Sequence, residues 1–241
     1  VFAVNYHAAN SLSPTSYPNL NTSYGNVFFN AWNIPGIPSA LVNRNNATVH
    51  PAYEEFNNNV NSQLSQLTEV KIEGNVAINS VTRQAEITVE LDYLSNSNYS
   101  TNYLTIMMLQ DSIFGSQSGA NNYNPEQIID GEYCHMHVLR DVITDTWGDA
   151  ITPTTAGTHI TKKYIYEIPE VIGDPNGVEV DLDNIYFLAF VTEKQDGTPT
   201  RPVLNVNKLV RETNSDEPVT PQSPLTFLYE GNDVTNSENY I

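Results

Sequence analysis

The sequence around residue 40 reads Ile34-Pro35-Gly36-Ile37-Pro38-Ser39-Ala40-Leu41-Val42-Asn43-Arg44. Two prolines and a glycine interrupt any regular element, and an apolar run of strand type follows them directly. The stretch therefore predicts a constrained loop that leads into a short buried strand at residues 39–42. If this loop framed an active site, the chain would need a reactive group beside it.

The segments on either side predict a small unit of mixed α and β structure. Residues 1–6 form a short apolar run that is typical of a buried strand. In residues 22–32, apolar side chains recur at helical spacing, and Thr22 or Ser23 is available as the N-cap. A second amphipathic helix is predicted to follow Pro51 and to reach residue 67, with one apolar and one polar face.

After Thr68 the apolar period changes from helical to two, as in half-buried antiparallel strands. The clearest example is residues 85–93, where apolar side chains alternate with acids and threonine. Glu73-Gly74 predicts a turn between two short strands, and Asp196-Gly197 predicts a hairpin. Further strands are predicted at residues 103–109, 133–140, 160–168, 185–192 and 203–211. About seven strands with no long intervening helix indicate an antiparallel β-sandwich.

The predicted fold class is therefore α+β, in three parts. Residues 1–67 form a mixed module, residues 68–212 form the β-sandwich, and residues 213–241 form a linker and tail. Prolines among acids and hydroxyls make the linker extended. Its apolar end at residues 225–229 could add a strand to an exposed sheet edge, on its own domain or on a neighbouring molecule.

Composition and charge exclude some functions. With 28 acidic and 10 basic side chains the net charge is -18, so binding to a phosphate backbone is not expected. No stretch approaches the ~20 consecutive apolar residues of a membrane span. The abundance of Asn, Thr, Ser and Tyr and the scarcity of Lys are typical of secreted or surface proteins.

Two further motifs, together with the run quoted above, carry a resemblance to a known family. They are Tyr133-Cys134-His135-Met136-His137-Val138-Leu139-Arg140-Asp141 and Trp147-Gly148-Asp149. Over roughly residues 1–211 the chain resembles the Omp28-related outer membrane proteins of Bacteroidetes. The resemblance implies the second half of a thioredoxin-like module followed by a β-rich domain, with an outer membrane-associated, periplasmic or extracellular location.

The same resemblance gives residues 37 and 38 a specific role. The Ile37-Pro38 bond would be the cis-proline that precedes a strand of a thioredoxin-like fold. The redox cysteines of such a module, and a lipid anchor, would lie upstream of Val1. Because neither is in this sequence, the resemblance carries over the proline loop without a nucleophile.

Cys134 is the single cysteine, which excludes an internal disulfide, a Cys-x-x-Cys pair and a cysteine zinc site within this sequence. In a continuous strand Cys134, Met136 and Val138 would share one face, so a buried core thiol is predicted. Thiol-disulfide exchange needs a thiolate and usually a resolving partner. We expect no cofactor.

Two groups of residues could bind metals, although a structural role is favoured for both. His135 and His137 would share the opposite strand face, and His159 or Asp141 could complete a zinc or copper site. Oxygen ligands cluster at Asp174-Pro175-Asn176-Gly177, followed by Glu179, Asp181 and Asp183, as in calcium loops. The spacing does not fit an EF-hand, so an acidic turn is the favoured interpretation.

Modification signals are short and weak. Asp111-Ser112-Ile113 resembles the O-glycosylation signal of Bacteroidetes, with Ser112 as acceptor. Asn21, Asn46 and Asn98 begin sequons that so Asn-rich a chain contains by chance. Neither a Gly-x-Ser-x-Gly motif nor a phosphate-binding glycine loop is present in the sequence.

These features favour a non-enzymatic envelope or surface protein whose β-sandwich binds a partner protein or a glycan. One alternative is a thiol-disulfide oxidoreductase whose cysteines lie upstream of Val1. Another is a subunit of a larger outer-membrane assembly, in which residues 225–229 dock on a neighbour.

Overall fold

The computed structural model describes residues 1–8, 17–32, 39–44, 53–193 and 201–212. Its longer strands are β1 (Val70–Asn79), β2 (Gln84–Tyr93), β3 (Asn102–Gln110), β7 (Val138–Val142), β9 (His159–Glu167), β12 (Ile185–Thr192) and β13 (Val203–Lys208). The short strands are β4 (Ile113–Gly115), β5 (Ile128–Ile129), β6 (Glu132–His135), β8 (Asp149–Ile151), β10 (Val171–Ile172), β11 (Val178–Glu179) and β14 (Val210–Arg211). The helices are α1 (Ser23–Ala31), α2 (Tyr53–Leu64), α3 (Ala120–Tyr123) and the 3-10 turn η1 (Pro125–Gln127).

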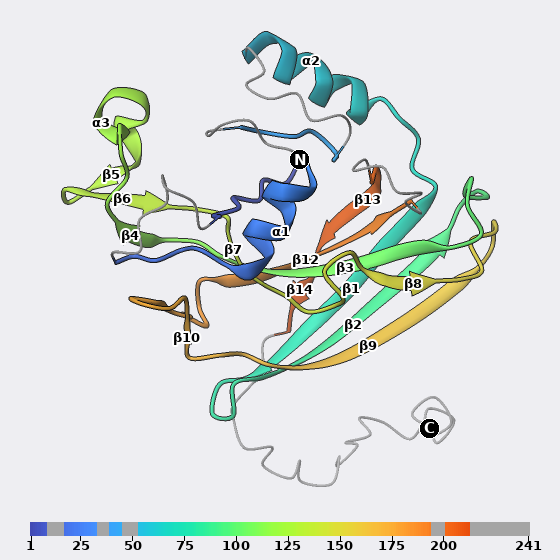
Figure 1. Cartoon of the computed structure of the whole chain (residues 1–241). Helices are drawn as coiled ribbons and strands as arrows, with labels where there is room; N and C mark the ends of the chain where they lie inside the picture. The colour runs from blue at the N-terminus through green and yellow to red at the C-terminus, as the bar shows by residue number, and fades with distance from the viewer. Residues whose placement is uncertain (9–16, 33–38, 45–52, 194–200, 213–241) are drawn as a thin grey trace, which may run out of the picture.

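Two β-sheets face each other, and α1 covers the outer side of one of them (Figure 1). The first sheet has the order β14-β1-β2-β9, and the second has the order β13-β12-β3-β7, with β8 also paired to β3. Neighbouring long strands are antiparallel throughout. The predicted α+β class and its sandwich-like arrangement of sheets are confirmed.

The main core lies between the two sheets and follows from the alternation in β2. Its inward side chains, Ala85, Ile87, Val89, Leu91 and Tyr93, are all buried. They pack against alternate residues of β3 and β12, while the acids of β2 point away. Burying each large apolar side chain contributes about 1.5–3 kcal/mol, so the period-two pattern selects this pairing.

Helix α1 builds a second apolar layer on the far side of the second sheet. Thr22 is the N-cap, because its hydroxyl accepts a hydrogen bond from the Gly25 amide at 3.0 Å. Phe28 and Trp32 then pack on side chains of β3, β7 and β12. Gly25 lies where residues 1–8 cross the helix, and a β-carbon there would be 1.9 Å from the His7 carbonyl oxygen. The predicted helix in residues 22–32 is confirmed.

Both strands predicted for residues 1–67 are wrong. In residues 1–6, Asn5 alone forms an isolated parallel bridge, to Val138. In residues 39–42 only the last residue is in a bridge, because Asn43 and Arg44 have φ values of 55° and 53° and turn the chain away. The mixed sheet that the resemblance implies is therefore not formed by the described residues, and the Ile37-Pro38 bond lies outside them.

The predicted turn at Glu73-Gly74 is also wrong, because β1 runs through it and pairs with β2 along its whole length. The chain reverses after Asn79, whose side-chain oxygen accepts hydrogen bonds from the amides of Val81 and Thr82. An Asx turn of this kind reverses the chain without a glycine.

The single strand predicted for residues 133–140 is broken into β6 and β7. His137 has a φ of 57°, and its amide donates to Asp111 Oδ1 at 2.6 Å. The chain therefore bends between Met136 and Val138, and the two predicted side-chain faces are not continuous. The strands predicted at residues 103–109, 160–168 and 185–192 are confirmed, and residues 203–211 form β13 and β14.

Helix α2 is confirmed, but its apolar face is not fully covered. Leu64 is 65% exposed and Leu67, beyond the helix end, is 95% exposed. The predicted hairpin turn at Asp196-Gly197 and the linker and tail from residue 213 lie outside the described residues. The domain boundary near residue 67 stays a prediction.

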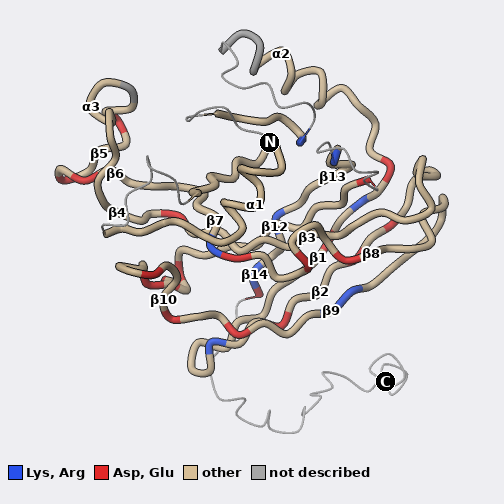
Figure 2. The backbone as a smooth tube through the Cα atoms, viewed as in Figure 1, with Lys and Arg blue, Asp and Glu red and all other residues tan. Residues whose placement is uncertain are grey.

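The charged side chains are distributed over the described part of the chain, and its helices are short. Figure 2 shows Asp and Glu spread over loops and strands, with the few Lys and Arg scattered among them. In the segments that the structure places, no helix is long and apolar enough to cross a bilayer.

Candidate functional site

A hollow of about 460 Å³ opens beside β8, where the β7–β8 loop meets the start of β13. It is lined by Tyr103, Asp145, Trp147, Gly148, Asp149, Ala150 and Arg201. The lining thus combines aromatic rings, two carboxylates and one guanidinium. A hollow of this size falls in the range of small-ligand sites, about 300–1,000 Å³.

The loop that carries most of this lining is held by its own hydrogen bonds. Asp145 Oδ1 accepts from the Trp147 amide and Asp149 Oδ1 accepts from the Asp145 amide, both at 3.1 Å. Gly148 has a φ of 92°, and a β-carbon there would lie 2.8 Å from Thr105 Oγ1 and 2.9 Å from the Leu104 carbonyl oxygen. Only glycine adopts this φ without strain and also leaves room for these two atoms, so the loop can lie close against β3.

Arg201 covers one side of the Trp147 ring. Its guanidinium carbon is 4.1 Å from the ring centroid, and its Nη1 donates to the Trp147 carbonyl at 3.3 Å. Burial, followed by the charge of Arg44, lowers the pKa of Arg201. The ring and the guanidinium therefore form one fixed wall of the hollow.

Behind this wall lies an aromatic cluster that links the hollow to α1. Trp147 makes edge contacts with Phe28 and Trp32, at centroid distances of 5.1 and 6.0 Å. The Arg44 guanidinium, in a residue only 7% exposed, lies over the rings of Phe28, Trp32 and Phe190. The position of Trp147 therefore depends on α1 as well as on its own loop.

Tyrosines of β9 fix the lining carboxylate of Asp149 and, on β7, that of Asp141. Tyr164 donates to Asp149 Oδ2 at 2.9 Å, and Tyr166 donates to Asp141 Oδ2 at 2.5 Å. Burial first, and then these carboxylates, raise the pKa of both tyrosines, which remain neutral donors. Among the described residues both oxygens of Asp149 accept hydrogen bonds, whereas only Oδ1 of Asp145 does, so Asp145 Oδ2 is the lining carboxylate oxygen with the most capacity to accept from a ligand.

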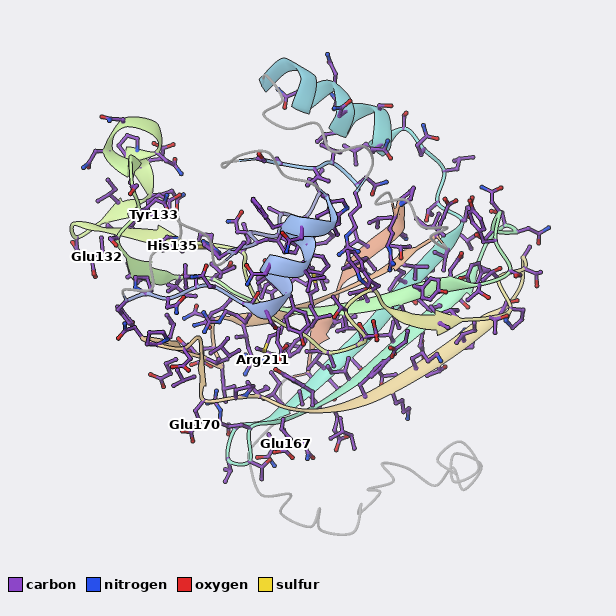
Figure 3. The ribbon with its side chains drawn as sticks, in the orientation of Figure 1. Glu132, Tyr133, His135, Glu167, Glu170 and Arg211 are labelled. Carbon is purple, nitrogen blue, oxygen red and sulfur yellow. The ribbon has the colours of Figure 1, made fainter. Side chains whose placement is uncertain are left out.

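The histidines predicted as metal ligands do not come together. His135 is buried against Tyr133 and His7, with ring centroids at 4.9 and 6.1 Å, and Figure 3 shows Tyr133 and His135 together on β6. His137 instead lies 2.8 Å from the Tyr186 hydroxyl and 3.2 Å from Asp111 Oδ1. The break between β6 and β7 separates the two rings.

The proposed third ligands have other partners. His159 Nδ1 lies 2.7 Å from Asp92 Oδ1, and Asp141 accepts from Tyr166. In the acidic turn, Asp174 and Asn176 are exposed, and Asp181 accepts bonds from Asp183 and Asn184. Within the placed residues no group of three or more His, Cys, Asp or Glu side chains could hold a metal ion.

The remaining candidates lie apart from the hollow. Cys134 is buried and its Sγ is 3.7 Å from Met136 Sδ. Ser112 is partly buried in the turn after β3, with a φ of 60°, and its amide donates to Met136 Sδ. Ile37 and Pro38 are outside the described residues.

Sequence reasoning used Trp147, Gly148 and Asp149 for the resemblance but missed them as a site, and it missed Tyr103, Asp145 and Arg201 altogether. The available signal was the run Asp145-Thr146-Trp147-Gly148-Asp149, which places acids, an indole and a glycine in one turn. Arg201 gave no local signal, because the β12–β13 pairing brings it to the loop.

Comparison with known proteins finds one matching family and similar solved structures. The family model described as outer membrane protein Omp28 matches residues 25–215. The structure of HBP35 of Porphyromonas gingivalis is similar with a TM-score of 0.59 at 16% identity, over 86% of this chain and 65% of that chain. A domain of the outer membrane lipoprotein Omp28 from the same organism has a TM-score of 0.36 at 15% identity, over 61% of this chain and 93% of that one. No curated protein matches the chain.

Proposed function

Because the chain belongs to the Omp28 family of outer membrane proteins, we propose that it is a non-enzymatic envelope protein that binds a glycan in the hollow beside β8. The family and the outer membrane-associated location are as the sequence predicts. The chain spans 65% of the length of the HBP35 structure, so the activity and partners of a whole protein of that kind are not transferred to it.

The observation that carries the proposal is the mixed lining of the hollow. A saccharide presents hydroxyl groups around its ring and apolar C–H faces above and below it. The Asp145 carboxylate can accept from hydroxyls, Arg201 can donate to ring or hydroxyl oxygens, and the Tyr103 ring offers apolar area. A few polar groups that converge beside aromatic surface are typical of small-ligand sites.

Size favours a glycan over a folded protein partner. A stable protein interface buries about 800 Å² on each partner. The hollow is a small concave site and offers no flat surface of that extent. Its volume of about 460 Å³ suits one or two sugar units. The proposal depends neither on a thioredoxin-like module in residues 1–67 nor on a lipid anchor upstream of Val1.

Replacing Asp145 with asparagine is expected to weaken glycan binding about tenfold, because one charge-assisted hydrogen bond becomes a neutral one. The amide oxygen can still accept from the Trp147 amide, so the loop keeps its fold. Isothermal titration with neutral and uronate-containing oligosaccharides measures the affinity. Quenching of tryptophan emission reports whether the sugar lies near Trp147.

The matched control is Asp183→Asn, which removes one exposed carboxylate far along the chain from the hollow. It is expected to bind as the unmodified protein does. Equal affinities for the two variants would contradict the assignment of the site. Absence of binding to the whole panel would overturn the function itself.

A further inference from the structure

Two imidazoles and a buried guanidinium act on one another where the N-terminal segment, residues 1–8, crosses β6 and β7. His7 comes from the segment, His135 from β6 and Arg140 from β7. His135 is 6% exposed and Arg140 is 2% exposed. His7 Nδ1, His135 Nε2 and Arg140 Nε are all buried without a hydrogen-bond partner. Such groups are costly unless they remain uncharged or find a counter-charge.

No carboxylate of the described residues pairs with this cluster. Among the described residues, the histidines that pair with a carboxylate are His137 and His159, and neither belongs to the cluster. Arg140 donates instead to the carbonyls of Ile172 and Val178, at 3.2 and 2.8 Å. The fixed charge of Arg140 thus disfavours a second positive charge beside it.

Both imidazoles resist protonation as a result. Burial, followed by the charges of His135 and Arg140, lowers the pKa of His7 to about 4, although a hydrogen bond with the Asn5 backbone acts in the opposite direction. Burial also lowers the pKa of His135, although a hydrogen bond with the Ser116 backbone raises it. Two other titratable groups of the described residues, both tyrosines, face the cluster. Tyr133 contacts the His135 ring, and Tyr17 raises the pKa of Arg140, which burial lowers to about 10. Near neutral pH the cluster therefore holds one positive charge, that of Arg140.

Besides this cluster, contacts of Val4, Asn5, Tyr6 and the His7 carbonyl hold the N-terminal segment in place. The Asn5 amide donates to the His137 carbonyl at 2.8 Å, and the Leu139 amide donates to the Asn5 carbonyl at 3.0 Å. Tyr6 packs its ring on Phe28 and Trp32, at centroid distances of 5.1 and 6.3 Å. A segment bound this way can open without unfolding the two sheets.

We propose that the His7–His135–Arg140 cluster is an acid-sensitive latch, which releases residues 1–8 from the edge of β7 when the pH falls. Release uncovers the backbone groups of β7 and one side of the aromatic cluster that supports Trp147. This inference is independent of the proposed glycan binding.

The direction of the pH effect follows from the two states of His7. In the released segment its pKa returns to about 6.5, whereas in the docked segment it is about 4. Between these values the released state binds a proton that the docked state refuses. Above pH 6.5 the docking equilibrium does not depend on this proton, and between pH 6.5 and about pH 4 opening becomes about tenfold more favourable for each unit by which the pH falls.

Amide hydrogen exchange by NMR tests the latch. Protection factors at Asn5 and Leu139, corrected for the intrinsic pH dependence of exchange, are expected to fall about tenfold per unit from pH 6.5 to pH 4. The Ile87 amide in β2 is expected to keep its protection over the same range. In the double variant His7→Gln/His135→Gln the pH dependence is expected to disappear, and His7→Gln alone serves if the double variant does not fold.

His159→Gln is the matched control, because that histidine is exposed on β9 and pairs with Asp92. It is expected to keep the full pH dependence at Asn5 and Leu139. The latch is refuted if the protection in the unmodified protein is constant down to pH 4.5, or if Ile87 loses protection in parallel. It is equally refuted if the double variant, or His7→Gln in its place, retains the whole fall.

Discussion

Phe28→Ala is expected to lower the free energy of unfolding by about 4 kcal/mol, because it removes a large aromatic side chain from a closely packed layer. The side chain is 1% exposed and lies between α1 and the second sheet. Its ring contacts Tyr6, Trp32 and Trp147 at centroid distances between 5.1 and 5.2 Å. Removing it leaves a cavity that the strands of the second sheet cannot close.

Urea unfolding, followed by tryptophan emission and far-ultraviolet circular dichroism, measures this loss. Val27→Ala is the matched control, because Val27 is the preceding helix residue and is 40% exposed. It is expected to change the stability by less than about 1 kcal/mol. The two probes are expected to give one coincident transition, shifted as a whole by Phe28→Ala.

The same experiment tests the boundary predicted near residue 67. If residues 1–67 were an independent module, Phe28→Ala would shift an early transition and leave the unfolding of the sheets unchanged. The packing of α1 on β3, β7 and β12 argues for one cooperative unit.

The elements that the sequence predicted well are those whose signal is local. In residues 85–93 the alternation alone determines which side chains are buried, because a slip of one residue would expose all of them. In residues 22–32 the helical spacing and the Thr22 cap are both carried by near neighbours. No distant contact is needed to recognise either element.

The wrong prediction of one continuous strand at residues 133–140 has a different cause, which is that the deciding partner is far away in the sequence. His137 bends the chain because Asp111 accepts its amide hydrogen bond, 26 residues away. The crossing of His7 over Gly25 is likewise a contact between distant parts of the chain, and it leaves no room for a β-carbon at residue 25. Local propensity cannot report such contacts.

The candidate site divides in the same way. Trp147, Gly148 and Asp149 stand together in the sequence, so a turn with an indole and a carboxylate was visible there. Arg201, which covers the indole, and Tyr164, which holds Asp149, reach the hollow through strand pairings. The sequence therefore indicated one wall of the hollow and not the chemistry of the others.

Gly74→Ala is expected to lower the free energy of unfolding by about 3 kcal/mol, the upper end of what overpacking costs. A β-carbon at this position would lie 2.3 Å from the Thr88 carbonyl oxygen and 3.1 Å from the Val89 Cα. Both atoms are backbone of β2, so they can move only if the β1–β2 ladder opens. Alanine also restricts the unfolded chain, but this favours folding by only about 0.4–1 kcal/mol.

Denaturant unfolding of Gly74→Ala and of Glu73→Ala separates this steric cost from a general effect on β1. Glu73 is exposed and makes a surface ion pair with Lys71, so its replacement is expected to cost less than about 1 kcal/mol. Adding Leu209→Ala to Gly74→Ala tests the cause, since Leu209 Cδ2 is the third close atom, at 3.0 Å. Because Leu209 is 3% exposed in the main core, the double variant is compared with Leu209→Ala alone. A leucine methyl group can move aside where a carbonyl oxygen cannot, so Gly74→Ala is expected to cost the same in both backgrounds. A smaller cost of Gly74→Ala in the Leu209→Ala background, or a neutral Gly74→Ala, would mean that β1 and β2 do not approach each other as closely at this position as the pairing requires.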